Sequence, residues 1–418
     1  MKKKRIAIIG TAGVPNRYGG FETLAHNLII NLSNEFDFTV YCTKKLYKKE
    51  ERVPQWHGAK CVYWSLNANG AQSILYDIIS MIHAIFFTDV LLVFGVSGGL
   101  IIPFLKLFSS KKIIVHIDGL EWRRQKWKGW IKRFLRFSEY VGLKYADADI
   151  ADNFALKRYT AIYYGTLSYL IEYGGNHTIK VEQTTESLKK HPFTSKPYAF
   201  KVCRIEPENN IHVILEAFAT AQSLPLVLVG NWQNSSYGIN LYEKFKNIPN
   251  IHLLAPIYDQ KELDILRSNC ALYLHGHSAG GTNPSLVEAM YLGLPVLAFD
   301  IPYNRATTEN QAFFFKNLDD LVLFLKNNPI AFVQPIGKTM QTIALKRYTW
   351  EIIAKKYRAA ILAFDYGYTR KKIKSELTST KRKDELAKKG YSHLAHTEPF
   401  YKDPEKNYGD VLNPQSKD

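Results

Sequence analysis

Short apolar runs alternate with longer amphipathic segments along most of the chain. In the first half, the apolar runs occupy residues 5–9, 38–41, 90–94, 112–117 and 148–151. A second series occupies residues 198–203, 225–229, 251–254, 271–274 and 295–299. Short continuous apolar runs are typical of strands buried in parallel sheets, and the segments between these runs are long enough for helices. The pattern predicts two doubly wound α/β domains.

A polar segment separates the two series. Residues 178–196 show no clear periodicity, and we interpret them as the interdomain connection, with a boundary near residue 190. The predicted domains therefore span 1–190 and 191–349. An amphipathic helix is expected over 350–365. Residues 366–418 are polar with few aliphatic side chains, and we predict a disordered tail there.

Composition and charge narrow the class of protein. Hydrophobic residues make up 46% of the 418 residues and charged ones 22%, which is ordinary for a globular protein. A net charge of +17 favours phosphorylated ligands, anionic lipid or nucleic acid as partners. The four cysteines lie far apart without a C-x-x-C pair, so we predict neither a zinc site nor a disulfide framework. A reducing cytoplasm fits this pattern best.

Three apolar stretches of the sequence are candidates for a signal peptide or a membrane segment. The run that follows the basic start ends at Gly10, which is too short for a signal peptide core. Acidic residues close the stretch at 78–87, and glycines with a proline interrupt the stretch at 90–104. We therefore predict no transmembrane span.

The loop after the first strand, residues 10–22, contains four glycines. Its spacing does not fit the G-x-G-x-x-G pattern of dinucleotide-binding proteins. Gly19 and Gly20 lie where a helix is predicted to begin, so backbone N–H groups there could approach an anion. An ordinary strand-to-helix turn explains the same residues.

Ionisable residues follow the apolar strand at 112–117. His116 and Asp118 lie at the end of that strand, with Glu121 close behind. Ligands of open α/β sheets bind beyond the carboxyl ends of the strands, so His116 and Asp118 are candidate catalytic residues. A single residue of either type at a strand end is more often a turn-former or a cap.

Basic and aromatic residues interleave over 123–137. Trp127 and Trp130, with Lys126 and Lys128, could contact anionic lipid if this segment is a helix at a membrane surface. The alternative is a basic amphipathic helix that covers its own core. The interleaving also suits single-stranded nucleic acid, but no RNA-binding motif accompanies it.

In the second series, Arg204 ends the first strand. A guanidinium group at this position could contact two phosphate oxygens and stabilise negative charge on a departing diphosphate. The structural alternative is an ion pair with Glu206 or Glu208.

The segment 275–295 has well-marked helix signals. Asn283 is a suitable N-cap and Pro284 a suitable first helical residue, while a glycine and a proline end the helix before the next strand. The preceding Gly280 and Gly281 leave backbone accessible to a phosphate or a sugar. Glu288 lies one turn inside the helix, where its carboxylate could accept hydrogen bonds from ribose hydroxyls or simply be solvated.

Together these motifs resemble family 4 glycosyltransferases of GT-B architecture, and among them the rhamnosyltransferase-like enzymes of bacterial surface polysaccharide synthesis. The resemblance covers residues 5–364. It rests on four segments in chain order: Gly-Val-Pro-x-x-Tyr-Gly-Gly-Phe-Glu at 13–22, Asp-Gly-Leu-Glu-Trp at 118–122, Pro-Glu-Asn-Asn at 207–210 and Gly-His-Ser-x-Gly-Gly-Thr-Asn-Pro-Ser-Leu-x-Glu-Ala-Met at 276–290.

The resemblance implies a fold and a set of donor contacts. The two domains would face a cleft, with the 350–365 helix returning to the N-terminal, acceptor-side domain. The C-terminal domain would bind the nucleotide-sugar. Gly19, Gly20 and Arg204 would contact the donor diphosphate. Glu288 would hold the ribose.

Two positions depart from the family pattern. The first of the family's two glutamates is replaced by Gly280, and the usual lysine after the phosphate-binding arginine is replaced by Asn209. The backbone amides of Gly281 and Thr282, next to Asn283, could substitute for these contacts. The rhamnosyltransferase-like branch shares both departures, which favours dTDP-rhamnose over a UDP-hexose or UDP-N-acetylhexosamine donor.

The implied reaction is a retaining sugar transfer that needs no metal or other cofactor. The expected acceptor is a saccharide on a lipid diphosphate, so the enzyme would be cytoplasmic and peripheral on the anionic inner face of the plasma membrane. Two alternatives remain at this point, a nucleotide-sugar epimerase and a non-catalytic scaffold. No nucleic-acid partner is expected.

Overall fold

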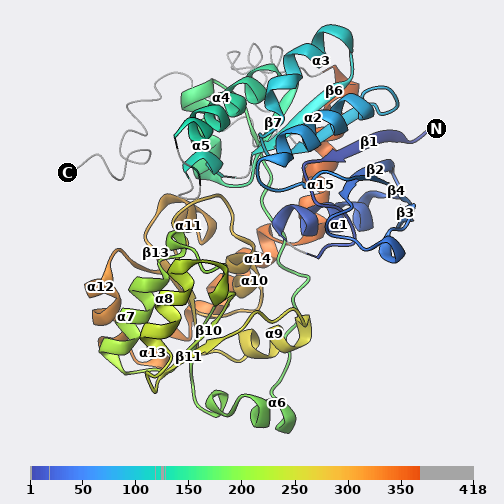
Figure 1. The fold of residues 1–418 in the computed structure, drawn as a ribbon. Coiled ribbons are helices and arrows are strands. Elements are labelled where there is room, and N and C mark those ends of the chain that lie inside the picture. The colour runs from blue at the N-terminus through green and yellow to red at the C-terminus, as the bar shows by residue number, and fades with distance from the viewer. Residues whose placement is uncertain (1, 18, 118, 124–126, 128, 368–418) are drawn as a thin grey trace. The chain divides into compact units, whose positions relative to one another are not determined.

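A computed structural model describes residues 2–17, 19–117, 119–123, 127 and 129–367. The chain folds as two compact units (Figure 1). Unit 1 contains the residues up to Glu172 together with those from Trp350 onward, and unit 2 contains Tyr173–Thr349. The predicted tail at 366–418 lies almost wholly outside the described residues.

Unit 1 is built on a mostly parallel sheet in which the strands follow the order β3-β4-β2-β1-β5-β6-β7-β8. Only the β3–β4 pair is antiparallel. The centre of the sheet is fully buried, with Ile6, Ile8 and Leu92 among the residues that have no exposed surface. The strands are β1 (Lys4–Ile9), β2 (Phe36–Thr43), β3 (Gln55–Trp56), β4 (Ala59–Trp64), β5 (Val90–Phe94), β6 (Lys112–Ile117), β7 (Ala148–Ala151) and β8 (Tyr169–Leu170).

Helices cover both faces of the unit 1 sheet. The connection from β1 to β2 runs in one direction along the sheet, and those from β4 to β5, β5 to β6, β6 to β7 and β7 to β8 run in the other. Right-handed crossovers therefore place α1 on one face and α2 to α5 on the opposite face. The helices are α1 (Gly20–Leu32), α2 (Gln72–Ala84), α3 (Ile102–Phe108), α4 (Trp130–Tyr145), α5 (Phe154–Tyr164) and α15 (Trp350–Leu362).

The expected helix near the end of the described chain is present as α15. It packs against α1 within unit 1, far from its neighbours in sequence. Ile353 and Tyr357 are fully buried on its inner side. This return of the chain to the first unit confirms the interpretation of residues 350–365.

Unit 2 has a second parallel sheet, in the strand order β11-β10-β9-β12-β13-β14. Its strands are β9 (Ala199–Val202), β10 (Leu226–Val229), β11 (Ile251–Leu254), β12 (Leu272–His275), β13 (Val296–Phe299) and β14 (Phe313–Phe315). One face of the sheet packs on a cluster that includes Ile214, Phe218 and Leu321. The helices are α6 (Thr185–Lys190), α7 (Ile211–Ala221), α8 (Ser236–Phe245), α9 (Gln260–Ser268), α10 (Pro284–Tyr291), α11 (Pro302–Thr307), α12 (Leu318–Asn327), α13 (Ile330–Val333) and α14 (Ile336–Arg347).

The segment that we interpreted as an interdomain connection lies along unit 2. The backbone N–H of Ile179 donates to Asp264 at 3.3 Å, and that of Val181 donates to Ser268 at 3.2 Å. The units divide after Glu172, whereas the polarity pattern placed the division near residue 190. Backbone N–H groups of this segment donate hydrogen bonds to side chains of α9 instead of to a neighbouring strand. Its sequence therefore lacks the apolar pattern of a strand and resembles that of a linker.

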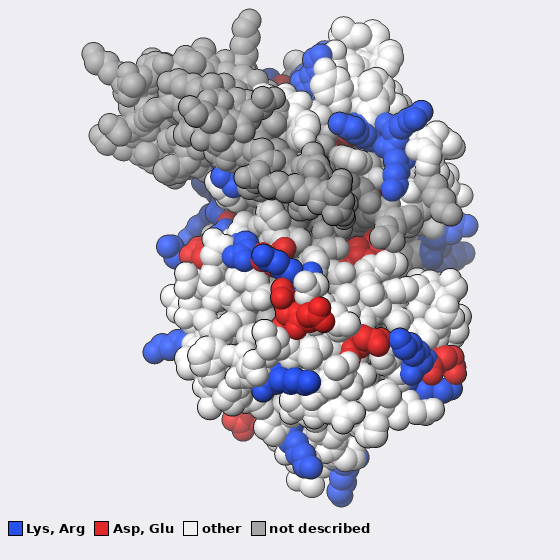
Figure 2. Space-filling model, turned by 90° about the vertical axis from the view of Figure 1, so that its left-hand side faces the viewer, with Lys and Arg blue, Asp and Glu red and all other residues white. Residues whose placement is uncertain are grey.

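On the face of unit 2 shown in Figure 2, acidic and basic side chains are interspersed. Within the described part of the chain, no helix is long and apolar enough to cross a membrane.

Gly10, just after β1, lies so close to a neighbouring strand that a larger residue would collide with its backbone. Its φ is +84°, and a Cβ there would lie 1.8 Å from the carbonyl oxygen of Phe94 on the neighbouring β5. Gly58 has a similar φ of +81°, but a Cβ there would meet no atom within 4 Å. The two glycines share a backbone strain and differ in steric crowding.

We expect Gly10→Ala to destabilise unit 1 by at least about 3 kcal/mol, because β1 and β5 must separate. Gly58→Ala should cost only about 1–2 kcal/mol, the penalty of the left-handed conformation. Six of the seven tryptophans lie in unit 1, and Trp232 lies in unit 2. Urea unfolding followed by tryptophan fluorescence therefore measures mainly the free energy of unfolding of unit 1. Equal losses in the two variants would contradict the assigned contact.

Candidate functional site

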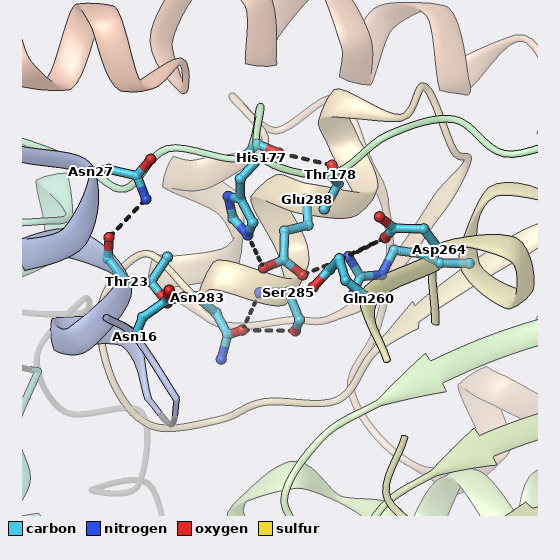
Figure 3. A network of polar contacts seen from close by, with 12 residues as sticks. Asn16, Thr23, Asn27, His177, Thr178, Gln260, Asp264, Asn283, Ser285 and Glu288 are labelled. Carbon is cyan, nitrogen blue, oxygen red and sulfur yellow. Dashed lines mark hydrogen bonds and ion pairs between the residues drawn. The ribbon is translucent and has the colours of Figure 1, made fainter. Parts of the chain in front are cut away.

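The N-terminus of α10 follows the sequence prediction. Asn283 is the N-cap, and its side-chain oxygen accepts from the backbone N–H of Ser285 at 3.1 Å and from the Ser285 hydroxyl at 2.8 Å (Figure 3). Pro284 is the first helical residue. The helix ends at Tyr291, and β13 begins at Val296, as the glycine and proline signals indicated. The first turn therefore presents its backbone N–H groups at a well-defined position.

Gly280 has a structural reason to be glycine. Its φ is +122°, a conformation that side chains rarely adopt, and a Cβ there would lie 3.0 Å from Nε2 of His277. A glutamate at this position would therefore need both a strained backbone and a displaced histidine. Gly281 is partly exposed, whereas Thr282 is buried.

Asn209 is engaged by neighbouring protein groups. Its side-chain Nδ2 donates to the carbonyl oxygen of Arg204 at 2.8 Å, and its Oδ1 lies 3.0 Å from Nδ1 of the buried His277. Because an amide oxygen only accepts, Nδ1 of His277 carries a proton in this contact. Asn209 thus orients the imidazole beside Gly280, a role that the sequence did not reveal.

Arg204 is exposed, with 47% of its side chain accessible. Its Nε lies 3.7 Å from a carboxylate oxygen of Glu206. This is the ion pair that we considered as the structural alternative, but its length and exposure make it weak. The guanidinium group therefore remains accessible to an anion.

Glu288 is held by two residues that sequence reasoning missed. Its Oε2 lies 2.7 Å from Nη1 of Arg267 on α9, and its Oε1 lies 3.0 Å from Nε2 of His177 (Figure 3). Burial favours the neutral carboxyl, but the positive charge of Arg267 and the hydrogen bond with His177 outweigh it. Together they lower the pKa of Glu288 to about 2. The carboxylate is thus ionised, with 13% of its side chain exposed.

Asp264 extends this network into the core of unit 2. Its Oδ1 lies 3.5 Å from Nη1 of the buried Arg267 and accepts a hydrogen bond from Gln260 at 3.0 Å. Burial raises the pKa of Asp264. Arg267 therefore bridges two carboxyl groups, and its position fixes that of Glu288.

The backbone of residues 173–179 brings His177 to Glu288. A Cβ on Gly175 would lie 2.6 Å from the carbonyl oxygen of Val287, so only glycine permits this approach to α10. The N–H of Gly175 donates to the carbonyl oxygen of Tyr348 at 2.7 Å. No local pattern marks this contact, because its partners are distant in sequence.

In unit 1, Gly19 is the N-cap of α1 and Gly20 its first residue, as expected. Gly19 has a φ of +98°, and a Cβ there would lie 2.4 Å from Oε2 of Glu22. The buried Glu22 accepts hydrogen bonds from the backbone N–H of Ala12 at 2.6 Å and from the hydroxyl of Thr11 at 3.2 Å. Glu22 thereby organises the glycine-rich loop, which gives that motif residue a structural role.

His116 lies at the carboxyl end of β6, but it is buried. Its Nδ1 forms a 2.6 Å hydrogen bond with the hydroxyl of Tyr357 on α15, and its ring contacts those of Phe21 and Phe94. Burial lowers the pKa of His116 to about 3, so the ring is neutral at physiological pH. Within the described residues, its Nε2 is buried without a hydrogen-bond partner. Asp118 lies outside the described residues.

The basic and aromatic segment is described in part. Trp130 begins α4 and is 71% exposed, whereas the indole N–H of Trp127 donates to Glu121 at 2.9 Å. Lys126 and Lys128 lie outside the described residues. Among the residues that are described, no group of three or more His, Cys, Asp or Glu side chains is arranged to hold a metal ion.

Two protein families match the chain. Residues 3–176 match a domain of unknown function, DUF1972. Residues 183–335 match the family of glycosyl transferases group 1. These matches fall on unit 1 and unit 2 respectively. No curated protein matches the sequence significantly.

Solved structures resemble the chain at low sequence identity. Sucrose-phosphate synthase from Thermosynechococcus elongatus has a TM-score of 0.73 at 15% identity, covering 88% of this chain and 100% of that chain. HepE from Anabaena, solved in complex with UDP-glucose, has a TM-score of 0.65 at 14% identity, covering 87% of this chain and 100% of that chain. A protein from Listeria monocytogenes, described as a UDP-N-acetylglucosamine 2-epimerase, has a TM-score of 0.56 at 15% identity, with 88% and 98% covered. These similarities confirm the expected GT-B fold.

The low pKa of Glu288 makes a prediction about stability and pH. A carboxyl group whose pKa falls from 4.5 to about 2 on folding contributes stability above pH 4.5, and this contribution is lost as the pH falls towards 2. We expect Glu288→Gln to destabilise unit 2 by about 3 kcal/mol at pH 7, because Arg267 is left buried beside a neutral amide. The difference between the unfolding free energies of the variant and the wild type should decrease as the pH falls from 4.5 to 2. Urea unfolding at a series of pH values measures it.

Glu216→Gln is the matched control, because Glu216 forms an exposed ion pair with Lys244 at 2.8 Å. Its effect should stay within about 1 kcal/mol and show little pH dependence. If the Glu288→Gln difference persisted unchanged to pH 3, the carboxylate would not be stabilised as described.

Proposed function

Because the chain is a glycosyltransferase with a group 1 domain at residues 183–335, we propose that it moves rhamnose from dTDP-rhamnose to a saccharide on a lipid diphosphate. The observation that supports nucleotide-sugar binding in unit 2 is the ionised Glu288 carboxylate, one turn inside the capped helix α10. Each carboxylate oxygen has two acceptor sites, and the contacts with His177 and Arg267 use one on each. One of the remaining sites can accept a hydrogen bond from the free hydroxyl of the deoxyribose in dTDP-rhamnose.

The diphosphate would be bound by the neighbouring loop and by Arg204. The backbone amides of Gly281 and Thr282 precede α10, where the helix dipole favours negative charge. The exposed Arg204 can contact phosphate oxygens with little competition from Glu206. In unit 1, Gly19 and Gly20 remain proposed backbone contacts to a diphosphate. These groups would stabilise the leaving diphosphate without a metal ion.

Gly280 supports a donor sugar that needs few protein contacts at this position. A glutamate at this position would strain the backbone and displace His277. A 6-deoxyhexose carries a methyl group in place of one hydroxyl, so it requires one hydrogen-bonding partner fewer. This favours rhamnose over the glucose of UDP-glucose, which HepE binds.

The proposed reaction retains the configuration of the transferred sugar. The acceptor hydroxyl attacks the anomeric carbon on the face from which the diphosphate departs. The bond from that carbon to the diphosphate oxygen breaks, and a departing phosphate oxygen takes the proton. His116 is neutral and buried, so we propose that it supports the acceptor side by fixing β6 against α15. Asp118 remains a proposed contact to sugar or acceptor.

A donor screen tests the function. The full chain is incubated with dTDP-rhamnose, UDP-glucose or UDP-N-acetylglucosamine, each with and without a lipid-diphosphate saccharide. We expect a glycosylated lipid only from dTDP-rhamnose and only with acceptor present. Conversion of donor without acceptor would indicate an epimerase, and product from a UDP-sugar would replace the proposed donor.

Arg204→Ala tests the diphosphate contact in the same assay. Losing a charge-assisted contact to the leaving group should lower kcat by roughly 100-fold. The matched control is Lys244→Ala, which removes an exposed cation of α8 that pairs with Glu216. Equal rates in the two variants would exclude Arg204 from the reaction.

A further inference from the structure

The outward face of α2 is apolar, which is unusual for a surface helix. Leu75, Ile79 and Ile82 are exposed at spacings that form one stripe, and Phe86 just after the helix is 79% exposed. Two polar residues of α2, Asp77 and Ser80, are buried, and Asp77 accepts a hydrogen bond from the hydroxyl of Ser97 at 2.5 Å. The helix therefore exposes a stripe of apolar side chains while it buries two polar ones.

The two following helices continue this surface. On α3, Phe104, Leu107 and Phe108 are exposed, Phe108 to 86%. On α4, a single stripe contains both aromatic and basic exposed side chains: Trp130, Arg133, Phe137, Tyr140 and Lys144. Lys144 lies over the rings of Tyr140 and Tyr145. Aromatic rings together with cations are typical of helices at a lipid headgroup boundary.

Acidic side chains are excluded from the outward surface of these helices. The acidic residues within α2, α3 and α4 are Asp77 and Glu139, and both are buried. Glu139 accepts hydrogen bonds from Tyr159 and Tyr164 at 3.0 and 2.6 Å. The exposed residues of these helices therefore include apolar, aromatic and cationic side chains but no carboxylate. In contrast, charges of both signs are interspersed on the face of unit 2 in Figure 2.

The three helices lie on one face of the unit 1 sheet, because their crossovers run in the same direction (Figure 1). They also share a packing partner. Asp77 of α2 binds Ser97, and the hydroxyl of Ser138 on α4 donates to the carbonyl oxygen of Val96 at 2.6 Å. α3 packs directly against α4. Their outward stripes therefore belong to one continuous surface.

We propose that this α2–α3–α4 surface docks on an anionic lipid bilayer, with the apolar side chains at the acyl boundary and the cations among the headgroup phosphates. The inference rests on the proposed function only in that a lipid-linked acceptor gives the enzyme a reason to be at a membrane. It extends the candidate contacts at Trp127 and Trp130 to two helices that carry most of the exposed apolar area. Hydrophobic burial and electrostatic attraction then act together.

Charge argues against a second copy of the chain as the occupant. A symmetric dimer through this surface would bring Arg133 and Lys144 of one copy towards the same residues of the other. Like charges at an interface are repulsive, and no exposed carboxylate on these three helices could offset them. An anionic bilayer supplies the missing negative charge.

Vesicle flotation tests the proposal without donor or acceptor. The full chain is mixed with vesicles of phosphatidylcholine alone or with vesicles that also contain roughly 30% phosphatidylglycerol, an anionic lipid that attracts basic residues near the membrane surface. We expect flotation with the anionic vesicles, weakened by high salt. The double variants Leu107→Glu/Phe108→Glu and Arg133→Glu/Lys144→Glu should each lower the partition coefficient by at least about tenfold.

Two exposed residues of unit 2 provide the controls, since Leu323→Glu and Lys338→Glu make the same chemical changes elsewhere. Both should float like wild type. The proposal is overturned if wild type does not float, if the unit 1 variants float equally well, or if the controls lose as much. The oligomeric state is also measured by sedimentation without vesicles. A wild-type dimer that the unit 1 variants dissociate would overturn the membrane proposal in favour of self-association. Because no sugar transfer is measured, these outcomes are independent of the donor screen.

Discussion

A charge buried in a protein must be paired, and in unit 2 this requirement links three segments through Arg267. The guanidinium group lies against Glu288 of α10 and Asp264 of its own helix, while His177 contacts Glu288 from the segment at 173–179. Removing any one partner would leave charge in a region where solvent cannot compensate for it. The network thereby fixes α9, α10 and the chain that enters unit 2 relative to one another. The Glu288 carboxylate is ionised because of this network.

Close backbone approach is the second constraint, and it decides where glycine is needed. Gly175 lets the chain pass over α10, and Gly10 lets β1 continue beside β5. Gly280 differs, since its neighbour is the side chain of His277, which Asn209 orients. The two departures from the family pattern, at 209 and 280, are thus physically coupled through one histidine. Asn209, His277 and Gly280 therefore form one local region in which the proposed donor site differs from the family pattern.

Much of the fold could be predicted because buried parallel strands appear as uninterrupted apolar runs. The runs at 90–94, 112–117 and 148–151 coincide with β5, β6 and β7. The strands β3, β4, β8 and β14 were missed. β3 and β8 have two residues each, and so short a strand leaves no periodic signal. The helix α6 was missed as well, although Thr184 and Ser187 form a capping box at its start. Its six residues are too few for an apolar stripe to emerge.

Local chemistry let the sequence by itself determine the start of α10, where Asn283 caps the helix, Pro284 opens it and Glu288 follows one turn later. Caps act over three or four residues, so they are readable from a short segment. Only the tertiary structure decided what holds Glu288, because His177 is 111 residues away and Arg267 lies on another helix. It also decided that His116 is a neutral residue joined to Tyr357, and that α2 turns its apolar side outward. Such facts depend on which faces of the elements meet, and a pattern along one element does not contain that information.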